Sequence, residues 1–299
     1  TTTIAVALVD LLSGEVLDRA SDSNPQSAHG DDVISRILFT TENKNGLKIL
    51  QAQAIKSINA LARELAERNN VDLMDIFEVV VVGNATMQHI MAGVPVFQIG
   101  LAPYVSAFCQ MQSICAENCG LGINPCGRMV IAPGVAGHVG GDTIAVTLAS
   151  EMEYNSGVTL AVDIGTNGEI VLAHDGLLFC CSTAAGPAFE GARINHGMRA
   201  ASGAIEKFSY NTDKGFSVAT IGNIPALGIC GSGLVDIVAN LLNLGIIDQT
   251  GRMLTREEMP DSTDKHILAR MTRHNDQPAF IVVPVEKSGR SEPVLLTQR

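Results

Sequence analysis

The stretch "LAVDIGTNGEIVLA", residues 160–173, carries the pattern that decides the fold. An apolar run ends in Asp163, passes through the turn Gly165-Thr166-Asn167-Gly168 and becomes apolar again. Asn-Gly between two apolar runs is a strong β-hairpin signal, so Asp163 could simply cap a turn. The same turn also suits a phosphate, because glycines allow close approach and nearby N–H groups can donate to anionic oxygens. Asp163 would then hold Mg²⁺, directly or through water. This hairpin alone leaves both interpretations open.

Composition limits the class of protein. The chain has 299 residues, enough for two domains of ordinary size, and 46% of them are hydrophobic. It contains neither an apolar run of 18 residues or more nor a signal peptide. Its net charge of −11 disfavours a nucleic-acid surface, which needs basic patches. We therefore expect a cytoplasmic protein with no membrane and no nucleic-acid partner.

Cysteines are the clearest candidates for metal ligands. Four of them cluster with gaps of five, three and six residues, at Cys109, Cys115, Cys119 and Cys126. This spacing matches neither a zinc ribbon nor the plant-type iron–sulfur pattern, so we expect reduced thiols and no bound iron or zinc. The other three, Cys180, Cys181 and Cys230, lie in apolar or glycine-rich runs and are expected to be buried.

The chain reads as two similar halves. "TTTIAVALVDLLSGEVLDRA" (1–20) aligns with "TNGEIVLAHDGLLFCCST" (166–183), which places Thr1 on Thr166, Thr2 on Asn167 and Asp10 on Asp175. Each copy has a small hydroxyl-rich turn, a strand, a turn containing glycine and a second strand. The second copy also has a full strand before its turn, and nothing precedes Thr1 in the first. We therefore expect the first domain to lack its first strand here.

Hydrophobic periodicity between the two copies predicts an α/β domain. Helical spacing predicts a helix over residues 31–39 and a long amphipathic helix over 45–70, with Asn45 as a plausible N-cap. The run "EVVVVGN" (78–84) is predicted to be a buried strand, followed by a helix through Met91. Residues 93–127 are expected to be an irregular loop. A strand from residue 128, a glycine-rich turn and a helix from about Asp142 complete the first half.

The second half is expected to begin at about residue 157. We predict domains over 1–153 and 157–299, the second with a short helix entering at Pro187 and strands near 204–209 and 216–221. In "ALGICGSGLVDIVANLLNLG" (226–245), glycines lie between a strand and a helix, where a ligand can approach the backbone and the helix N-terminus. Their order is not that of the Rossmann fingerprint. Tight helix–strand packing is the alternative explanation for these glycines.

Three glycine-rich or hydroxyl-rich turns, at 1–3, 165–168 and 228–233, together resemble those of the acetate and sugar kinase, heat-shock chaperone and actin superfamily. The resemblance implies an α/β fold of two ribonuclease-H-like, actin-like ATPase domains with mixed sheets. It also implies ATP and Mg²⁺ in an interdomain cleft.

A closer resemblance spans nearly the whole chain. The following strings are similar to the ATPase part of reductive activators of corrinoid proteins: "TTTIAVALVD", "NPQSAHGDDVISRI", "VVVVGNATMQHIMAG", "LAPYV", "APGVAGHVGGDT", "DIGTNGEIVLA", "STAAGPAFEGARI", "GMRAASGAIEKF" and "GICGSGLVD". The resemblance implies ATP-dependent electron donation to a Co(II) corrinoid protein, restoring Co(I). It places the iron–sulfur cluster in a module outside this chain. The electron donor is unknown, and a homodimer is compatible with the resemblance.

Residue roles follow from the same resemblance. It implies that Asp163 binds magnesium or organises water, and that Asp142 orients the attacking water, although Asp142 also fits a plain helix cap. It implies phosphate contacts from Thr1, Thr2, Thr3, Gly165, Thr166, Asn167 and Gly168. The adenosine would be bordered by Gly228, Gly231, Ser232 and Gly233, and Gly140 and Gly141 would start the connecting helix. Asn84 and Glu190 are weaker candidates, and His138 fits a turn better than a ligand site.

The chain differs from the family pattern in two ways. It contains no iron–sulfur module, and it reads as an internal fragment that starts just after the expected Asp-Ile-Gly and stops at "VLLTQR". Two other functions stay open. One is a small-molecule kinase of the same superfamily, and the other is a nucleotide-dependent binding module without turnover.

Overall fold

The computed structural model describes residues 1–165, 167–184 and 194–298. They form two compact units, one of Thr1–Asp163 with Glu169–Ser182 and one of Ile164–Gly168 with Thr183–Arg299. The predicted helix at Pro187 lies outside the described residues. No helix of the described ranges is long and apolar enough to cross a bilayer.

The first unit begins with a β-hairpin. Strand β1 (Thr3–Val9) pairs antiparallel with β2 (Val16–Ser23), as the sequence predicts. The Asp10 carboxylate accepts the N–H groups of Leu12 at 2.7 Å and Ser13 at 3.1 Å, which closes the turn between the strands. Helix α2 packs on both strands of this hairpin.

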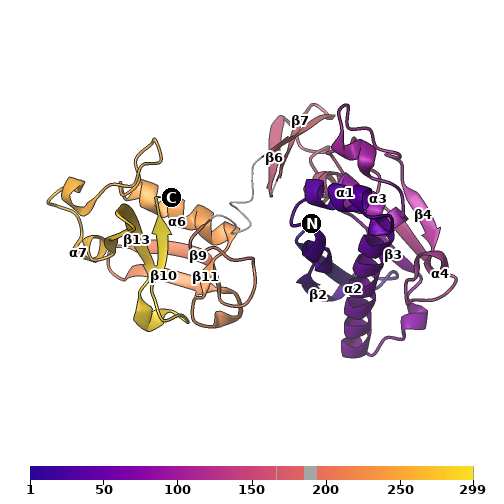
Figure 1. The fold of residues 1–299 in the computed structure, drawn as a ribbon, viewed down its shortest axis with the longest axis horizontal. Coiled ribbons are helices and arrows are strands. Elements are labelled where there is room, and N and C mark those ends of the chain that lie inside the picture. The colour runs from indigo at the N-terminus through magenta and orange to yellow at the C-terminus, as the bar shows by residue number, and fades with distance from the viewer. Residues whose placement is uncertain (166, 185–193, 299) are drawn as a thin grey trace. The chain divides into compact units, whose positions relative to one another are not determined.

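Three helices of the first unit match the sequence prediction. They are α1 (Val33–Glu42), α2 (Gly46–Asn69) and α3 (Ala85–Ala92), drawn from indigo to purple in Figure 1. Asn45 is the N-cap of α2, but its side chain makes no capping hydrogen bond. Asn70 ends the helix in the left-handed conformation, with φ of 54°, which Asn tolerates better than most residues.

A second sheet of this unit has the order β3-β5-β4. Strand β3 (Glu78–Val81) runs parallel to β5 (Arg128–Ile131), and β4 (Gln112–Cys115) pairs antiparallel with β5. The expectation of an irregular loop over 93–127 is therefore wrong, because β4 and the short α4 (Ala116–Cys119) lie within it. Ala116 and Ile114 pack into the core with Met129, which outweighs the local Pro, Cys and Gly content.

The hairpin singled out in the sequence forms a three-stranded sheet of order β6-β7-β8. Its strands are β6 (Val158–Ile164), β7 (Asn167–His174) and β8 (Leu177–Ala184), and α5 (Gly141–Ala149) precedes them. Cys180 and Cys181 are exposed, so the expectation that they are buried is wrong; Cys230 is buried as predicted. Consecutive side chains of a strand point to opposite faces, so both faces of β8 are uncovered at this point, whereas β7 carries the buried Val171 and Ala173.

The second unit is built on two further sheets. In the first, β9 (Ala204–Asn211) lies between β10 (Gly215–Thr220), which is antiparallel, and β11 (Gly228–Ile229), which is parallel. Helix α6 (Gly231–Asn243) packs on β9. The second sheet contains β12 (Met271–His274), β13 (Gln277–Val283) and β14 (Val294–Thr297), and α7 spans Lys265–Leu268. Their shared core includes Ile205, Ile237 and Phe280.

Candidate functional site

Buried side chains hold the first turn, Thr1-Thr2, in place. The carbonyl oxygen of Thr1 accepts hydrogen bonds from Arg36 Nη2 at 2.7 Å and Asn24 Nδ2 at 2.9 Å. The carbonyl oxygen of Thr2 accepts the backbone N–H of Asn24 at 2.9 Å. Arg36 is fully buried and also donates to Gln26 Oε1 at 3.1 Å. Because a buried guanidinium needs hydrogen-bond acceptors, the carbonyl of Thr1 is part of what makes this burial tolerable.

Thr1 is also tied to the start of α3. Asn84 Nδ2 donates to Thr1 Oγ1 at 2.8 Å, and Asn84 Oδ1 accepts the N–H of Met87 at 3.0 Å as the helix N-cap. Both ends of the Asn84 amide are therefore engaged. The structure thus places the weaker sequence candidate, Asn84, directly beside a predicted phosphate-loop residue.

The Gly140-Gly141-Asp142 turn packs against the residues on either side of Asn84. The N–H of Asp142 donates to the carbonyl of Gly83 at 3.2 Å, and the N–H of Gly141 donates to Gln88 Oε1 at 3.0 Å. A Cβ on Gly140 would lie 2.5 Å from the Gly83 oxygen, closer than atoms tolerate. Both glycines are therefore required by packing, and the turn is locked beside Asn84.

Asp142 lies in the first turn of α5. The N-cap of α5 is Gly140, so the prediction that Asp142 caps this helix is wrong. The Asp142 carboxylate accepts the N–H of Thr143 at 2.8 Å, which still satisfies one free donor of the first turn. Burial raises the pKa of Asp142, and the negative charge of Asp163 raises it further.

A third carboxylate, Glu169 on β7, belongs to the same group and was missed by the sequence analysis. Burial raises its pKa, the charges of Asp142 and Asp163 add to this, and a hydrogen bond from Ser182 Oγ at 3.1 Å opposes it. Asp163 itself is exposed near the end of β6. The sequence does contain a signal for Glu169, because it is an acid directly after the Asn-Gly pair, inside an otherwise apolar strand.

The donor chemistry of this acidic group, Asp142, Asp163 and Glu169, fits Mg²⁺. The negative charge of Asp163 raises the pKa of both other carboxylates, and a divalent cation would relieve this repulsion. Thr143 Oγ1 is buried next to Asp142 without a hydrogen-bond partner among the described residues. The described residues contain no group of three His, Cys, Asp or Glu side chains that could hold a metal alone. Mg²⁺ does not need three protein ligands, because it usually binds one or two carboxylates and completes its coordination shell with water and phosphate oxygens.

Two described residues of the 165–168 segment, Gly165 and Asn167, contact each other through the backbone. The N–H of Gly165 donates to the carbonyl of Asn167 at 3.0 Å, and Gly168 is buried in β7. Thr166 lies outside the described residues. In this structure the Gly165 N–H is used within the loop, so a phosphate contact through that group stays a prediction.

Packing accounts for two glycines around the start of α6. A Cβ on Gly228 would lie 2.8 Å from the carbonyl oxygen of His196, and one on Gly233 would collide with the Ile205 carbonyl. The N-cap, Cys230, provides no side-chain cap for the first-turn N–H groups of α6. Ser232 is exposed at this helix end, and contacts of Gly231 and Ser232 with an adenosine stay a prediction.

The remaining sequence candidates lie apart from these groups. His138 lies in the turn between Ala136 and Val139 and contacts the ring of Tyr104, with 4.8 Å between ring centroids. Glu190 lies outside the described residues. Of the clustered cysteines, Cys115 and Cys126 are exposed, and Cys109 and Cys119 are half-buried.

Comparison with known proteins gives the family. A family model described as the RACo middle region matches residues 1–155, and one described as the C-terminal domain of RACo, the ASKHA domain, matches residues 157–299. The chain belongs to the RACo family. The predicted resemblance to the ATPase part of corrinoid activators is thereby confirmed, as is the actin-like ATPase fold class within a mixed α/β chain.

The names of two relatives of this RACo chain refer to corrinoid activation or to reduction of a corrinoid protein. The corrinoid activation enzyme RamQ of Eubacterium limosum is 32% identical over 100% of this chain and 50% of its own length. The [Co(II) methylated amine-specific corrinoid protein] reductase of Methanosarcina barkeri is 29% identical over 41% of this chain and 26% of its own length.

A solved structure shows the same fold. The reductive activator for corrinoid, iron-sulfur protein matches with a TM-score of 0.83 and 38% identity, over 99% of this RACo chain and 46% of that chain. The chain therefore spans about half the length of the solved activator and of RamQ.

Proposed function

We propose that this chain is the ATPase part of a reductive activator of a corrinoid protein. It would couple ATP binding and hydrolysis to the one-electron reduction of Co(II) to Co(I), with the electron supplied by an iron–sulfur module outside residues 1–299. The observation that carries this proposal is the match to both RACo regions, which together span nearly the whole chain. We also propose a cytoplasmic location, because a reducing compartment suits seven free cysteines.

Two carboxylates have separate proposed roles. Asp163, which is exposed, would hold Mg²⁺, and bound Mg²⁺ would neutralise charge on the phosphate oxygens. Asp142 would orient the attacking water and accept its proton. Its raised pKa supports this role, because a general base works best when its pKa approaches the working pH. Glu169 would add negative charge beside both and so strengthen cation binding.

We propose nucleotide contacts for the glycine-rich and hydroxyl-rich turns. Thr1, Thr2, Thr3, Gly165, Thr166, Asn167 and Gly168 would contact phosphates. Gly228, Gly231, Ser232 and Gly233 would border the adenosine. Gly140 and Gly141 would position Asp142, which their packing against Gly83 and Gln88 supports. The proposed domains are 1–153 and 157–299, and the two family models meet near this boundary.

Coupling requires the nucleotide to bind two states of the activator with different affinity, since a ligand shifts an equilibrium only by that difference. ATP would favour the state that binds the Co(II) corrinoid protein, and hydrolysis would release it. The partner of this chain is thus proposed to be a corrinoid protein, as the names of its relatives suggest for them.

The test uses the full-length protein under anaerobic conditions with a chemical reductant and a Co(II) corrinoid protein. We expect ATP hydrolysis and ATP-dependent loss of the Co(II) absorbance. Phosphate transfer to an added metabolite without corrinoid reduction would instead indicate a small-molecule kinase. Nucleotide binding without turnover would indicate a binding module.

A further inference from the structure

One buried amide closes the base of the loop that leads to Asp142. Gln88, on α3, is only 2% exposed. Its Nε2 donates to the carbonyl oxygen of Ala132 at 2.9 Å, and its Oε1 accepts the N–H of Gly141 at 3.0 Å. Ala132 directly follows β5, and Gly141 directly precedes Asp142. A single side chain therefore binds both ends of the segment 132–141.

This segment depends on contacts with the rest of the unit to keep one conformation. Three of its residues are glycines: Gly134, Gly137 and Gly140. Glycine loses more conformational freedom on folding than any other residue, so a glycine-rich segment is costly to order. The Asp142 N–H bond to the Gly83 carbonyl, at 3.2 Å, holds one end of it. The Gln88 amide holds the same end and also ties it to the other.

A polar residue at position 88 calls for an explanation, because six of the eight residues of α3 are buried. An apolar side chain would fill the same space without a polar group to satisfy. Both ends of the Gln88 amide are paired, which makes its burial tolerable. A Cβ on Gly141 would collide with Gln88 Nε2, so glycine at 141 lets the amide approach this closely. The two residues are thus fitted to each other.

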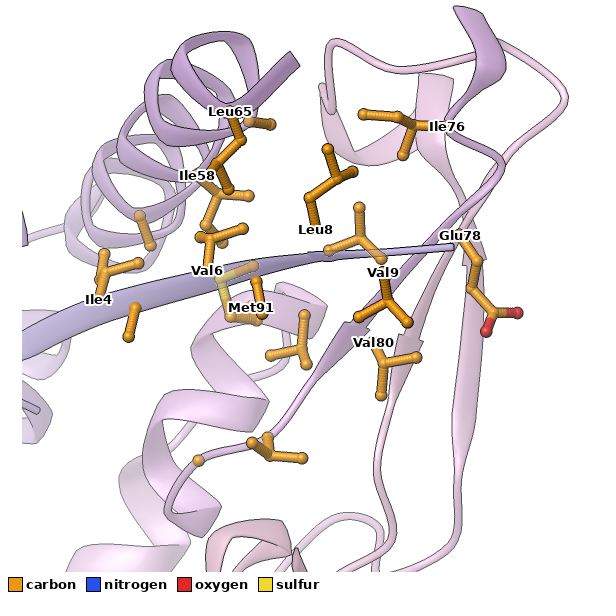
Figure 2. Close-up of a pocket in the computed structure, with 18 of the residues that line it drawn as sticks. Ile4, Val6, Leu8, Val9, Ile58, Leu65, Ile76, Glu78, Val80 and Met91 are labelled. Carbon is orange, nitrogen blue, oxygen red and sulfur yellow. The ribbon is translucent and has the colours of Figure 1, made fainter. Parts of the chain in front are cut away.

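Helix α3 is a rigid base for this contact. His89, beside Gln88, is buried, and its Nε2 accepts the N–H of Ala107 at 3.1 Å. Met91, three residues after Gln88, belongs to the same hydrophobic core as Ile58 of α2 (Figure 2). A side chain on an element that is packed in this way can hold its partner within a narrow range of positions.

The role proposed for Asp142 makes its position important. A group that orients attacking water must lie within hydrogen-bond reach of it, about 2.6–3.2 Å, and a misplacement of about 1 Å can cost about 100-fold in rate. The Thr143 N–H bond to the Asp142 carboxylate, at 2.8 Å, fixes the side chain relative to α5. The Gln88 bond to Gly141 fixes the start of α5 relative to α3.

We propose that Gln88 is a positioning residue for ATP hydrolysis, which closes the base of the 132–141 loop and so holds the Asp142 carboxylate where it orients the attacking water. The inference rests on the role proposed for Asp142. Gln88 acts through Asp142, so its removal slows the hydrolytic step and leaves nucleotide affinity unchanged.

The first test compares Gln88→Met with Gln51→Met in the full-length protein. Methionine is similar in length to glutamine and removes the amide. Gln51, on α2, is the matched control, because its Nε2 donates to the carbonyl of Met91 at 2.9 Å, at the other end of α3.

We expect Gln88→Met to lower kcat for ATP hydrolysis at least tenfold, while the Kd of a non-hydrolysable ATP analogue changes less than twofold. Gln51→Met should lower the melting temperature without changing kcat. Equal losses of kcat in the two variants would show that any lost buried amide has this effect. That result would overturn the proposal, as would a loss explained by weaker binding of the analogue.

The second test asks whether Gln88 acts through Asp142. Asp142→Asn keeps an oxygen that can accept the Thr143 N–H, and residues that act through one another have non-additive effects. We expect Gln88→Met to change single-turnover hydrolysis less than twofold in the Asp142→Asn background. A further tenfold loss in that background would show a separate effect and overturn the proposal.

A second variant covers the case in which Gln88→Met does not fold. Gln88→Asn is one methylene shorter and cannot bridge both backbone groups, so we expect the same loss of kcat and the same non-additivity. Full kcat in Gln88→Asn would overturn the proposal. Absence of hydrolysis in the unmodified protein would refute the proposed function and this inference with it, whereas hydrolysis that the Gln88 variants leave unchanged would refute this inference alone.

Discussion

Asp163→Asn separates a magnesium ligand from a turn residue. Asn suits a turn as well as Asp does, so a purely structural role predicts a silent change. Asp163 is exposed, and a surface change of this kind alters stability by about 0.5 kcal/mol or less. The fold should therefore survive, and any loss of activity would come from the loss of the negative charge.

The size of that loss follows from the exposure of Asp163. Two unit charges 4 Å apart interact by about 1 kcal/mol in water and about 4 kcal/mol at an effective dielectric constant of about 20. Because Asp163 is exposed, we expect the lower part of this range and a fall in ATP turnover of at least about tenfold, or about 1.4 kcal/mol of barrier. Removing this charge should also lower the pKa of Asp142 and Glu169, since Asp163 raises both.

The assay measures steady-state ATP hydrolysis, corrinoid reduction and a melting curve on the full-length protein. Asp175→Asn is the matched control, because Asp175 lies in the β7–β8 turn with φ of 49°, a conformation that Asn also tolerates. We expect the control to keep full activity. Unchanged hydrolysis in Asp163→Asn would refute the magnesium role, and hydrolysis without corrinoid reduction would indicate a role in coupling instead.

Three further predictions follow from the first unit. Gly140→Ala should destabilise the protein by about 1–3 kcal/mol, because its Cβ would lie 2.5 Å from the Gly83 oxygen, whereas Gly83→Ala, with its nearest contact at 3.7 Å, should change the melting temperature little. The raised pKa of Asp142 means that its contribution to stability is complete below the unfolded pKa and is lost as pH rises through the folded pKa. Asp142→Asn should therefore raise the melting temperature more at pH 7 than at pH 4 while lowering hydrolysis, and an equal shift at both pH values would contradict the burial argument. Metal analysis of the purified 1–299 chain should find no stoichiometric iron or zinc, and one equivalent bound through Cys109, Cys115, Cys119 and Cys126 would show this to be wrong.

Local patterns predicted the elements whose signal is local. The spacing of Leu50, Ile58 and Leu65 predicts α2, and all three are buried on one face. The apolar run before Gly83 predicts β3, but the expectation that this strand is buried is wrong, since Val80 is 60% exposed. The hairpin at 158–174 is predicted as well, although Asn167 and Gly168, expected in its turn, already lie in β7. These signals reside within one element, so they do not depend on tertiary contacts.

Features that depend on tertiary contacts were not predictable. β4 has an unremarkable sequence and exists because it pairs with β5. Cys180 and Cys181 lie in an apolar run, but among the described residues no element covers either face of their strand at this point. The involvement of Glu169 depends on β7 bringing it close enough to feel the charges of Asp142 and Asp163, which are distant in sequence. Likewise, the need for glycine at position 140 is set by the backbone of Gly83, 57 residues earlier.

We propose that ATP use by the full-length protein drives reduction of a corrinoid protein. The most direct measurement follows the Co(I) absorbance of a Co(II) corrinoid protein mixed anaerobically with the reduced full-length activator, with ATP, with a non-hydrolysable ATP analogue and with no nucleotide. We expect Co(I) formation with ATP and at least tenfold less in Asp163→Asn. Equal Co(I) formation with and without nucleotide would contradict it.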